Sequence, residues 1–452
     1  MSNVLDLVDH TFFRIERAAG VTNVIQCVWV YNRVIDIDGL RRFHRHLQQG
    51  RLRRRIELSP LPFGRHRWVS PSGNSDLEIV ENPRPREEFD AWLGNQADTP
   101  IDAEHGPGWH LAVLPFTDGG AGVSLVASHC LTDAVGLCEA VADATAGCDN
   151  AINWPAAGSR PRWRALREDA RQTVRDIPGI GRATVAAARF VRHNLGRAGS
   201  ATPTPAPSAG ADERITPPTA TIFVDADEWD ARAHSLGGTA NTLLEALAAR
   251  LAQRVGRVTP HGLVTLGMPV NLRTAGDTRA NAITTVDITV DPATATTDLR
   301  EIRAATKQTL IRSQEQPDEQ WTLLPLVPLV PQRLGRPWVG VATNSATSVG
   351  VSNVGVVNPA VNRPDGTDAD HFAMKSLSLG RTTAMMHQLG GLLSLLSGRA
   401  QGRVFVSVVA YQPDHPNSND DLQQHLSSVV SEFSLTATIG CWPSPEPVSG
   451  AR

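Results

Sequence analysis

A stretch near the middle of the chain, residues 196–218, divides the sequence into two parts. It is rich in proline, alanine, serine and threonine and poor in large apolar residues, so it cannot bury enough surface to pack. A chain of 452 residues is also too long for one ordinary core but suits two domains of about 200 residues each. We therefore predict an N-terminal lobe over 1–195, a flexible linker over 196–218 and a C-terminal lobe over 219–452.

Both parts combine helical and strand patterns, which predicts an α/β protein. The opening segment 2–19 places Leu5, Val8, Phe12 and Ile15 on one face at helical spacing. The other elements that we expect are strands at 23–31, 109–116, 122–129, 219–224, 262–272, 283–290 and 403–411, and helices at 38–49, 133–146, 239–253, 298–313 and 420–433. Asp38 is the expected cap of the helix at 38–49, and Asp133 is at the start of the helix at 133–146. Two αβ halves of similar size favour a ligand cleft between them.

Composition excludes several classes of protein. The net charge of −3 argues against nucleic-acid binding. The five cysteines have no paired spacing, which argues against a zinc or redox site, so we expect no metal and a reduced, cytoplasmic protein. Residues 1–16 lack the pattern of a secretory signal, and no apolar run reaches the ~18 residues that span a bilayer.

The segment 128–134, Ser-His-Cys-Leu-Thr-Asp-Ala, contains two candidate functional side chains. It places His129 at the end of a predicted strand and Asp133 at the start of a helix, a junction where side chains commonly face a cleft. A neutral imidazole, with an ordinary pKa of ~6.5, can accept a proton from a hydroxyl near neutral pH. No Gly-x-Ser-x-Gly elbow surrounds a serine. From the residues alone, His129 is either a general base or a hydrogen-bonded structural histidine.

This segment resembles the His-His-x-x-x-Asp-Gly signature of the wax ester synthase/diacylglycerol acyltransferase family. That family belongs to the chloramphenicol acetyltransferase-like superfamily, which also includes the condensation domains of peptide synthetases. The order of further matching segments extends the resemblance over most of the chain, at 7–13, 53–55, 62–69, 99–102, 107–109, 238–242, 268–273, 281 and 351–355.

The resemblance implies two chloramphenicol acetyltransferase-like lobes with a central tunnel, and His129 as the catalytic base. It implies that Asp133 pairs with Arg273 and holds the histidine loop in shape. The donor it implies is acyl-CoA, which is a substrate, so no cofactor is expected. Candidates for contacts with the thioester oxyanion or the substrate are Ser352, Asn353 and Asn241.

Three positions depart from the family pattern. Ser128 replaces the first histidine, Ala134 replaces the glycine after the acid, and Thr242 replaces an acid. A glycine at 134 would allow a positive φ or leave room for a substrate, so Ala134 either narrows the tunnel or marks a loss of activity.

Three functions therefore stay open. The first is an O-acyltransferase that acts on a long-chain alcohol, diacylglycerol or glycolipid. The second is a condensation-like acyltransferase that takes its acyl group from a carrier protein. The third is a non-catalytic homologue that binds a lipid or a protein partner.

The segment 160–197 carries an excess of arginine that the whole chain does not share. Apolar residues interleave with these arginines, as in helices that lie at a membrane surface. We predict reversible, peripheral association with anionic membranes through this segment. The alternative is an ordinary solvated helix pair, interrupted at Pro178 and Gly179.

Overall fold

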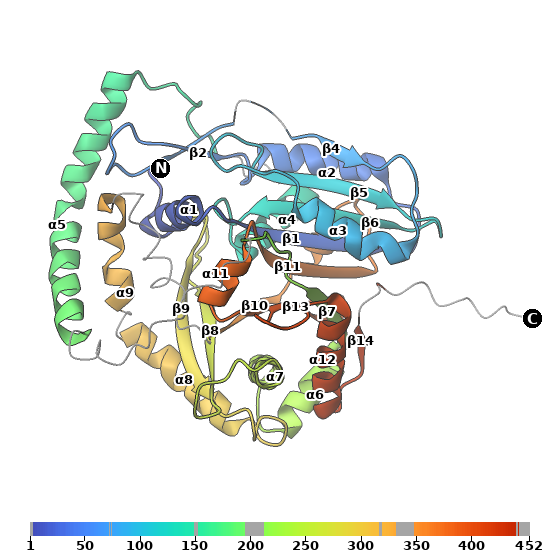
Figure 1. The fold of residues 1–452 in the computed structure, drawn as a ribbon. Coiled ribbons are helices and arrows are strands. Elements are labelled where there is room, and N and C mark those ends of the chain that lie inside the picture. The colour runs from blue at the N-terminus through green and yellow to red at the C-terminus, as the bar shows by residue number, and fades with distance from the viewer. Residues whose placement is uncertain are drawn as a thin grey trace, which may run out of the picture.

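The computed structural model describes residues 3–71, 73, 75–148, 152–194, 212–315, 319–330, 348–439 and 442. Two β-sheets with covering helices form two lobes of an α/β protein, which confirms the predicted fold class (Figure 1). Most of the predicted linker, up to residue 211, lies outside the described residues. Within the described ranges, no helix combines the length and apolarity needed to cross a bilayer.

The sheet of the first lobe has five strands. Their order is β11 (His371–Leu379), β1 (Thr22–Tyr31), β6 (Ala121–Ser128), β5 (Trp109–Pro115) and β4 (Leu77–Ile79). All neighbours are antiparallel except β4 and β5. Eight consecutive residues of β1, from Val24 to Tyr31, are buried, as expected for a central strand covered on both faces. A separate small ribbon pairs β2 (Arg55–Glu57) with β3 (Arg67–Val69).

The sheet of the second lobe has seven strands. Their order is β14 (Ala437–Ile439), β7 (Thr219–Asp225), β13 (Arg403–Tyr411), β12 (Leu392–Ala400), β10 (Val349–Val356), β8 (Val264–Asn271) and β9 (Ile283–Val290). Strand β10 is parallel to both β12 and β8, and the other pairs are antiparallel. Helices α7 and α12 pack on this sheet, and α6 packs on α7.

The helices begin at side-chain caps where the sequence supplies them. Asp6 caps α1, Asp133 caps α4 and Ser418 caps α12. For the second helix the predicted cap was wrong, because the Asp36 side chain, not Asp38, accepts the N–H groups of Asp38 and Gly39. The helices are α1 (Leu7–Ala19), α2 (Ile37–Gln49), α3 (Phe89–Ala97), α4 (Ala134–Ala146), α5 (Arg162–Asn194), α6 (Ala226–Ser235), α7 (Ala240–Arg254), α8 (Arg300–Glu315), α9 (Glu319–Thr322), α11 (Thr383–Gln388) and α12 (Asn419–Glu432), with short 3-10 turns η1 (Arg86–Glu88), η3 (Leu324–Leu329) and η5 (Pro359–Asn362).

Helix α5 differs from the interrupted helix pair that we considered. It is a single helical segment with Pro178 inside it, and it lies along one edge of the molecule (Figure 1). Proline removes one backbone hydrogen bond and strains the preceding turn, but the helix continues on both sides of it.

The second half of the chain also contributes to the first sheet. Strand β11 pairs with β1 along its whole length, from Thr22 opposite Leu379 to Val30 opposite His371. Residues 212–218, which we expected to be part of the flexible linker, hydrogen-bond to the loop before α11 through Glu213 and Ile215. The residue ranges that we predicted for the two lobes therefore do not coincide with the two sheets, because the chain crosses back to complete the first sheet.

Candidate active site

His129 is the first residue after β6, and contacts from three segments hold it. Its N–H donates to the Asn23 carbonyl at 2.8 Å, and its carbonyl accepts from Asn281 Nδ2 at 3.1 Å. Its imidazole lies on the ring of Phe12 in α1, with the ring centroids 5.3 Å apart and the planes 6° from parallel. Stacking of this kind fixes the orientation of a ring as well as burying it. The position of the imidazole therefore depends on α1, β1 and the second half of the chain together.

The two nitrogens of the His129 ring lie in different surroundings. The residue is partly buried, and its Nδ1 is buried with no hydrogen-bond partner in the described part of the chain. Nε2, in contrast, is not a buried atom without a partner. The ring therefore turns its Nδ1 atom inward.

Glu16, in the last turn of α1, is a buried acid beside His129. Its carboxylate accepts the Asn23 N–H at 3.1 Å and Asn23 Nδ2 at 3.0 Å. Burial raises the pKa of Glu16, whereas hydrogen bonds from Cys130 and Asn23 and the charge of His129 act to lower it. Glu16, which the sequence reasoning did not assign, therefore interacts electrostatically with the imidazole.

Asp133 caps α4 with one carboxylate oxygen and binds two groups of the second half of the chain with the other. Its Oδ1 accepts the Gly136 N–H at 2.6 Å, and its Oδ2 accepts the Ala282 N–H at 2.9 Å and Arg273 Nη2 at 2.7 Å. In the described ranges no hydrogen bond joins this carboxylate to His129. Asp133 thus organises the loop that follows the histidine.

Arg273 completes this ion pair from the second half of the chain, 140 residues away. The side chains of Arg273 and Asp133 are only 3% and 5% exposed. The guanidinium also donates to the carbonyls of Arg279 at 3.1 Å and Ala280 at 3.0 Å. The pairing of these two residues, which the family resemblance implied, is present, and it joins the two halves of the chain behind His129.

The turn at residues 280–282 contacts both Asp133 and Arg273, and it also binds Asp9 of α1. The fully buried Asp9 carboxylate accepts the N–H groups of Ala280 at 3.0 Å and Asn281 at 2.7 Å, and Asn281 Nδ2 at 3.2 Å. Burial raises the pKa of Asp9 to about 6 against these hydrogen bonds. Because Asn281 also donates to the His129 carbonyl, Asp9 helps to fix the backbone of His129.

Sequence reasoning missed Asp9 and Glu16, although a local signal was present. The two acids are seven residues apart and lie on the same face of the opening helix as Leu5 and Phe12. Acids on the apolar face of an amphipathic helix are seldom buried without hydrogen-bond partners. The pattern thus pointed to a polar site beneath α1, but it did not identify the partners.

Arg54, within the matching segment 53–55, holds the same loop through hydrogen bonds to backbone carbonyls. Its Nε donates to the Leu131 carbonyl at 3.1 Å and its Nη1 to the Thr278 carbonyl at 2.6 Å. The guanidinium lies over the Trp68 ring, 4.4 Å from the centroid. Burial lowers the pKa of Arg54 to about 10, and the charge of Asp9 opposes this effect.

The three residues predicted as oxyanion or substrate contacts lie on two elements of the second lobe. Asn353 in β10 donates from Nδ2 to Asn241 Oδ1 at 2.6 Å, and its own Oδ1 accepts the Gly355 N–H at 2.8 Å. Both asparagines are exposed, and Ser352 is partly buried. Within the part of the chain that the structure describes, no hydrogen bond joins any of the three to His129, so their role stays a prediction.

Ser128 and Cys130, on either side of the histidine, have structural surroundings. The Ser128 hydroxyl, in place of the family's first histidine, accepts the Cys130 N–H at 3.2 Å and shapes the turn. Cys130 is fully buried, and this burial holds the pKa of its thiol well above the ordinary value. A thiol in these surroundings is not a ready nucleophile.

The other two departures from the family pattern are also accommodated. Ala134 is the first residue of α4 and is not among the described residues with positive φ, so it does not need the conformational freedom of glycine. The close approach is instead at Gly136, where a Cβ would lie 2.9 Å from Arg273 Nη2. Thr242 forms a reciprocal capping box with Thr239, the role that an acid at this position commonly plays.

The two pockets described in the structure lie away from the imidazole. The larger, of about 210 Å³, lies between α1, α5 and η3, and its one acid, Asp176, is 3.5 Å from Arg65. The smaller, of about 10 Å³, lies beside the Asp133–Arg273 pair. We place the candidate site at His129 because a proton-accepting group is held there in a fixed orientation. The predicted tunnel stays a prediction, and in the described ranges no group of three or more His, Cys, Asp or Glu side chains is arranged to hold a metal ion.

Comparison with known proteins identifies the fold. No protein-family model matches the sequence, and no curated protein matches it. The first condensation domain of the calcium-dependent antibiotic synthetase, in complex with a substrate analogue, is similar with a TM-score of 0.57 and 14% identity over 96% of each chain. The wax ester synthase/diacylglycerol acyltransferase from Marinobacter aquaeolei VT8 has a TM-score of 0.54 and 15% identity over 95% of this chain and 98% of its own.

Polyketide synthase associated protein 5 from Mycobacterium tuberculosis has a TM-score of 0.54 and 16% identity over 93% of this chain and 97% of its own. At identities this low the similarity concerns the fold. The chain therefore has the two-lobed fold shared by condensation domains and the wax ester synthase/diacylglycerol acyltransferase, as the sequence resemblance predicted.

Proposed function

We propose that this protein is an acyltransferase in which His129 is the general base. The observation that carries this proposal is the way in which the imidazole is held, stacked on Phe12 with Nδ1 buried. A base contributes to catalysis only when its geometry is fixed relative to the proton that it accepts. The similarity in fold to condensation domains and to a wax ester synthase/diacylglycerol acyltransferase supports acyl transfer as the reaction class.

In the proposed reaction, His129 Nε2 accepts the proton of the acceptor hydroxyl as the oxygen attacks the thioester carbonyl. The carbon–sulfur bond then breaks, and the imidazolium returns the proton to the departing thiolate. No covalent acyl-enzyme is formed. The nearby Glu16 carboxyl, when ionised, would favour the positive charge that His129 carries between these steps.

Asp133 and Arg273 act in this scheme as positioning residues. Their ion pair, with the Ala282 and Gly136 N–H groups, holds the loop that follows the histidine. Neither residue takes a proton from the substrate. Their removal should affect the fold of the loop as well as turnover.

For the substrates, we propose an acyl-CoA donor and the hydroxyl of a long-chain alcohol, diacylglycerol or glycolipid as acceptor. The second candidate is an acyl donor bound to a carrier protein, which the similarity to a condensation domain of an antibiotic synthetase favours. The third, a non-catalytic homologue, finds less support, because Ser128, Ala134 and Thr242 all fit the local geometry without strain.

Mass spectrometry of products tests the proposal. Purified protein is incubated with a series of acyl-CoA donors, or with acylated carrier protein, and mixed alcohols. His129→Ala should lower turnover by about 100-fold or more, since a positioned base typically contributes that much. His261→Ala, a change at an exposed histidine, is the matched control and should leave turnover unchanged. Equal rates for wild type and His129→Ala, with unchanged thermal unfolding, would remove His129 as the base.

A further inference from the structure

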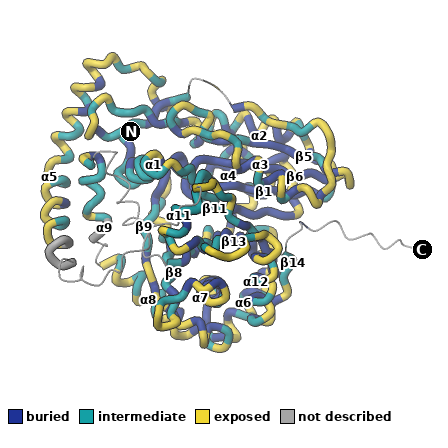
Figure 2. The backbone as a smooth tube through the Cα atoms, in the orientation of Figure 1, coloured by how far each residue is buried: buried dark blue, intermediate teal, exposed yellow. Residues whose placement is uncertain are grey.

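Helix α5 packs against the rest of the protein along one side only. The residues of its contact side include the buried Ala165, Asp169 and Ala183. Asp169 is tied to the first lobe by Arg67 at 2.9 Å and Arg160 at 3.1 Å. Most other residues of α5 are exposed, as its outer edge in Figure 2 shows. The helix therefore presents a long outer surface.

That outer surface carries an apolar stripe. Five of the eleven large apolar side chains that are exposed in the described part of the chain belong to α5, and they are 42% to 65% exposed. At about 100° per residue these five fall within an arc of about 100° that points away from Ala165 and Ala183. The stripe consists of Trp163, Leu166, Val174, Ile177 and Val185. An ordinary solvated helix would place mainly polar residues in this arc, whereas here, within 162–189, the polar residues in it are Arg167 and Thr184, at its two edges.

A row of arginines runs along one edge of the stripe. Five of them fall within an arc of about 40° at the same helical spacing. The row consists of Arg164, Arg171, Arg175, Arg182 and Arg189. Arg164 pairs with Glu168 at 2.9 Å, whereas within the described ranges the other four form no ion pair. Residues 162–189 contain seven arginines and three acidic residues, a net charge of +4 on a chain whose net charge is −3.

We propose that the outer surface of α5 binds an anionic lipid bilayer. Interfacial helices bury an apolar face about 5–10 Å into the boundary between headgroups and acyl chains, while arginines meet lipid phosphates. A second copy of this chain fits the surface less well, because it would bring the same arginine row. Asp169 and Asp176 of α5 lie on its inner side, and Glu168 is already paired with Arg164 of the row, so the acids of a second α5 would not neutralise the other arginines.

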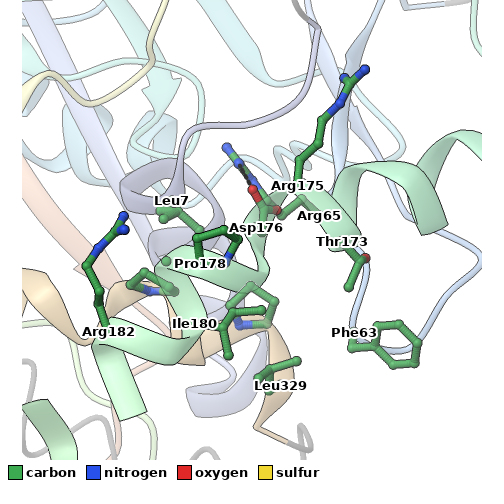
Figure 3. Close-up of a pocket in the computed structure, with 13 residues that line it drawn as sticks. Leu7, Phe63, Arg65, Thr173, Arg175, Asp176, Pro178, Ile180, Arg182 and Leu329 are labelled. Atoms are coloured by element: carbon green, nitrogen blue, oxygen red, sulfur yellow. Dashed lines mark hydrogen bonds and ion pairs between the residues drawn. The ribbon is translucent and has the colours of Figure 1, made fainter. Parts of the chain in front are cut away.

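The pocket of about 210 Å³ lies beside the same surface. Arg175 and Arg182 are among its lining residues, together with Leu7, Pro325 and Leu329. Figure 3 shows Arg175 and Arg182 on either side of Pro178. The surface thus has a hollow with cationic and apolar walls. The cationic walls complement an anionic lipid headgroup, and the apolar walls complement the start of its acyl chain.

Helix α1 connects this pocket to the candidate active site. Leu7 of α1 lines the pocket, and Phe12 of the same helix stacks on His129. Arg14 of α1 also donates from Nη1 to the Pro328 carbonyl of η3 at 3.1 Å. Docking on a bilayer would place α1 between the lipid and His129. The binding proposal itself does not depend on the proposed acyl transfer, and its test measures no activity.

Vesicle co-sedimentation tests the proposal. Full-length protein is mixed with vesicles of phosphatidylcholine alone or with phosphatidylglycerol, at low and high salt. We expect binding to the anionic vesicles only, and weaker binding at high salt. The triple variant Arg171→Gln, Arg175→Gln, Arg182→Gln should bind about 100-fold more weakly, because each arginine near the surface is worth about fivefold. Val174→Gln with Ile177→Gln should weaken binding at both salt concentrations.

The matched control uses α8, another exposed helix with positive side chains. Arg303→Gln, Lys307→Gln and Arg312→Gln remove the same charge from exposed positions and should leave vesicle binding within about twofold of wild type. Quenching of tryptophan fluorescence by brominated lipids gives a second measurement, and Trp163→Phe should reduce it. Thermal unfolding shows whether each variant is folded.

Three results would overturn the proposal. The first is recovery of wild-type protein in the supernatant with every vesicle. The second is binding that the α8 variant weakens as much as the α5 variants do. The third is a dimer in light scattering that the Val174 and Ile177 changes dissociate, which would assign the stripe to a second copy.

Discussion

The loop behind His129 and the outer side of α5 both depend on arginine, in opposite ways. Arg273 is 3% exposed and donates to Asp133 and two carbonyls. Arg171 on α5 is exposed and has no ion pair in the described part of the chain. A buried guanidinium must be paired, whereas an exposed one remains available to an external anion. The difference indicates that the first region maintains the structure and that the second is suited to binding.

The two regions also shift the pKa values of their acidic side chains in opposite directions. Burial raises the pKa of Asp9. The bond from Arg164 lowers the pKa of the more exposed Glu168 on α5. The negative charge of a carboxylate is therefore disfavoured at the buried Asp9 and favoured at Glu168. Three sets of variants test this difference.

The largest effect is expected from Arg273→Met. It leaves the buried Asp133 carboxylate without its cation and should reduce the free energy of unfolding by about 3–5 kcal/mol. Arg171→Gln should change it by less than about 0.5 kcal/mol. Urea unfolding of both variants measures the difference. The double change Asp133→Leu, Arg273→Met should cost less than the sum of the two single changes, and strict additivity would show that the pair is not coupled.

A smaller effect should appear in the dependence of stability on pH. The pKa of Asp9 rises from 3.8 to about 6 on folding, so its proton stabilises the folded state fully below pH 3.8, and this contribution is lost as pH rises through about 6. The difference in unfolding free energy between wild type and Asp9→Asn should therefore fall by about 3 kcal/mol between pH 3 and 7. For Glu168→Gln the sign is opposite, because a lowered pKa confers stability that is lost as pH falls. A difference curve for Asp9→Asn that is flat with pH would contradict the raised pKa.

The smallest effect is expected from two glycine changes. A methyl group at Gly136 would lie 2.9 Å from Arg273 Nη2 and from Thr132 Oγ1, so Gly136→Ala should destabilise by about 1–3 kcal/mol. At Gly181 of α5 nothing lies within 4 Å of the added methyl, so Gly181→Ala should stabilise by about 0.5–1 kcal/mol. Thermal unfolding of the two variants checks the contrast. Equal shifts would mean that the loop behind His129 tolerates repacking.

Local sequence patterns predicted many elements well. Strands β9 and β13 have the predicted limits, 283–290 and 403–411, and Asp133 lies at the predicted helix start. Strands β10 and β12 and helices α3 and α6 were not among the predicted elements. β10 has two glycines and an asparagine in eight residues and pairs in parallel with two strands, so its pairing comes from its neighbours.

The periodicities and the chemistry of the histidine segment can be read from the amino-acid sequence alone. Apolar spacing depends on which residues share a face, so it identified the opening helix and the strand that ends at residue 128. The family resemblance added the pairing of Asp133 with Arg273. It also predicted a fold that the comparison with solved structures confirmed.

Which residues cover each face of a helix or strand is visible only in the folded chain. Periodicity does not show whether an acid on an apolar face finds partners, and those of Asp9 lie at Ala280 and Asn281, about 271 residues along the chain. Nor does it show that β11 completes the first sheet or that the apolar stripe of α5 faces outward. These arrangements depend on contacts between segments that are distant in the sequence. Such contacts form, and stabilise the protein, only when folding brings the segments together.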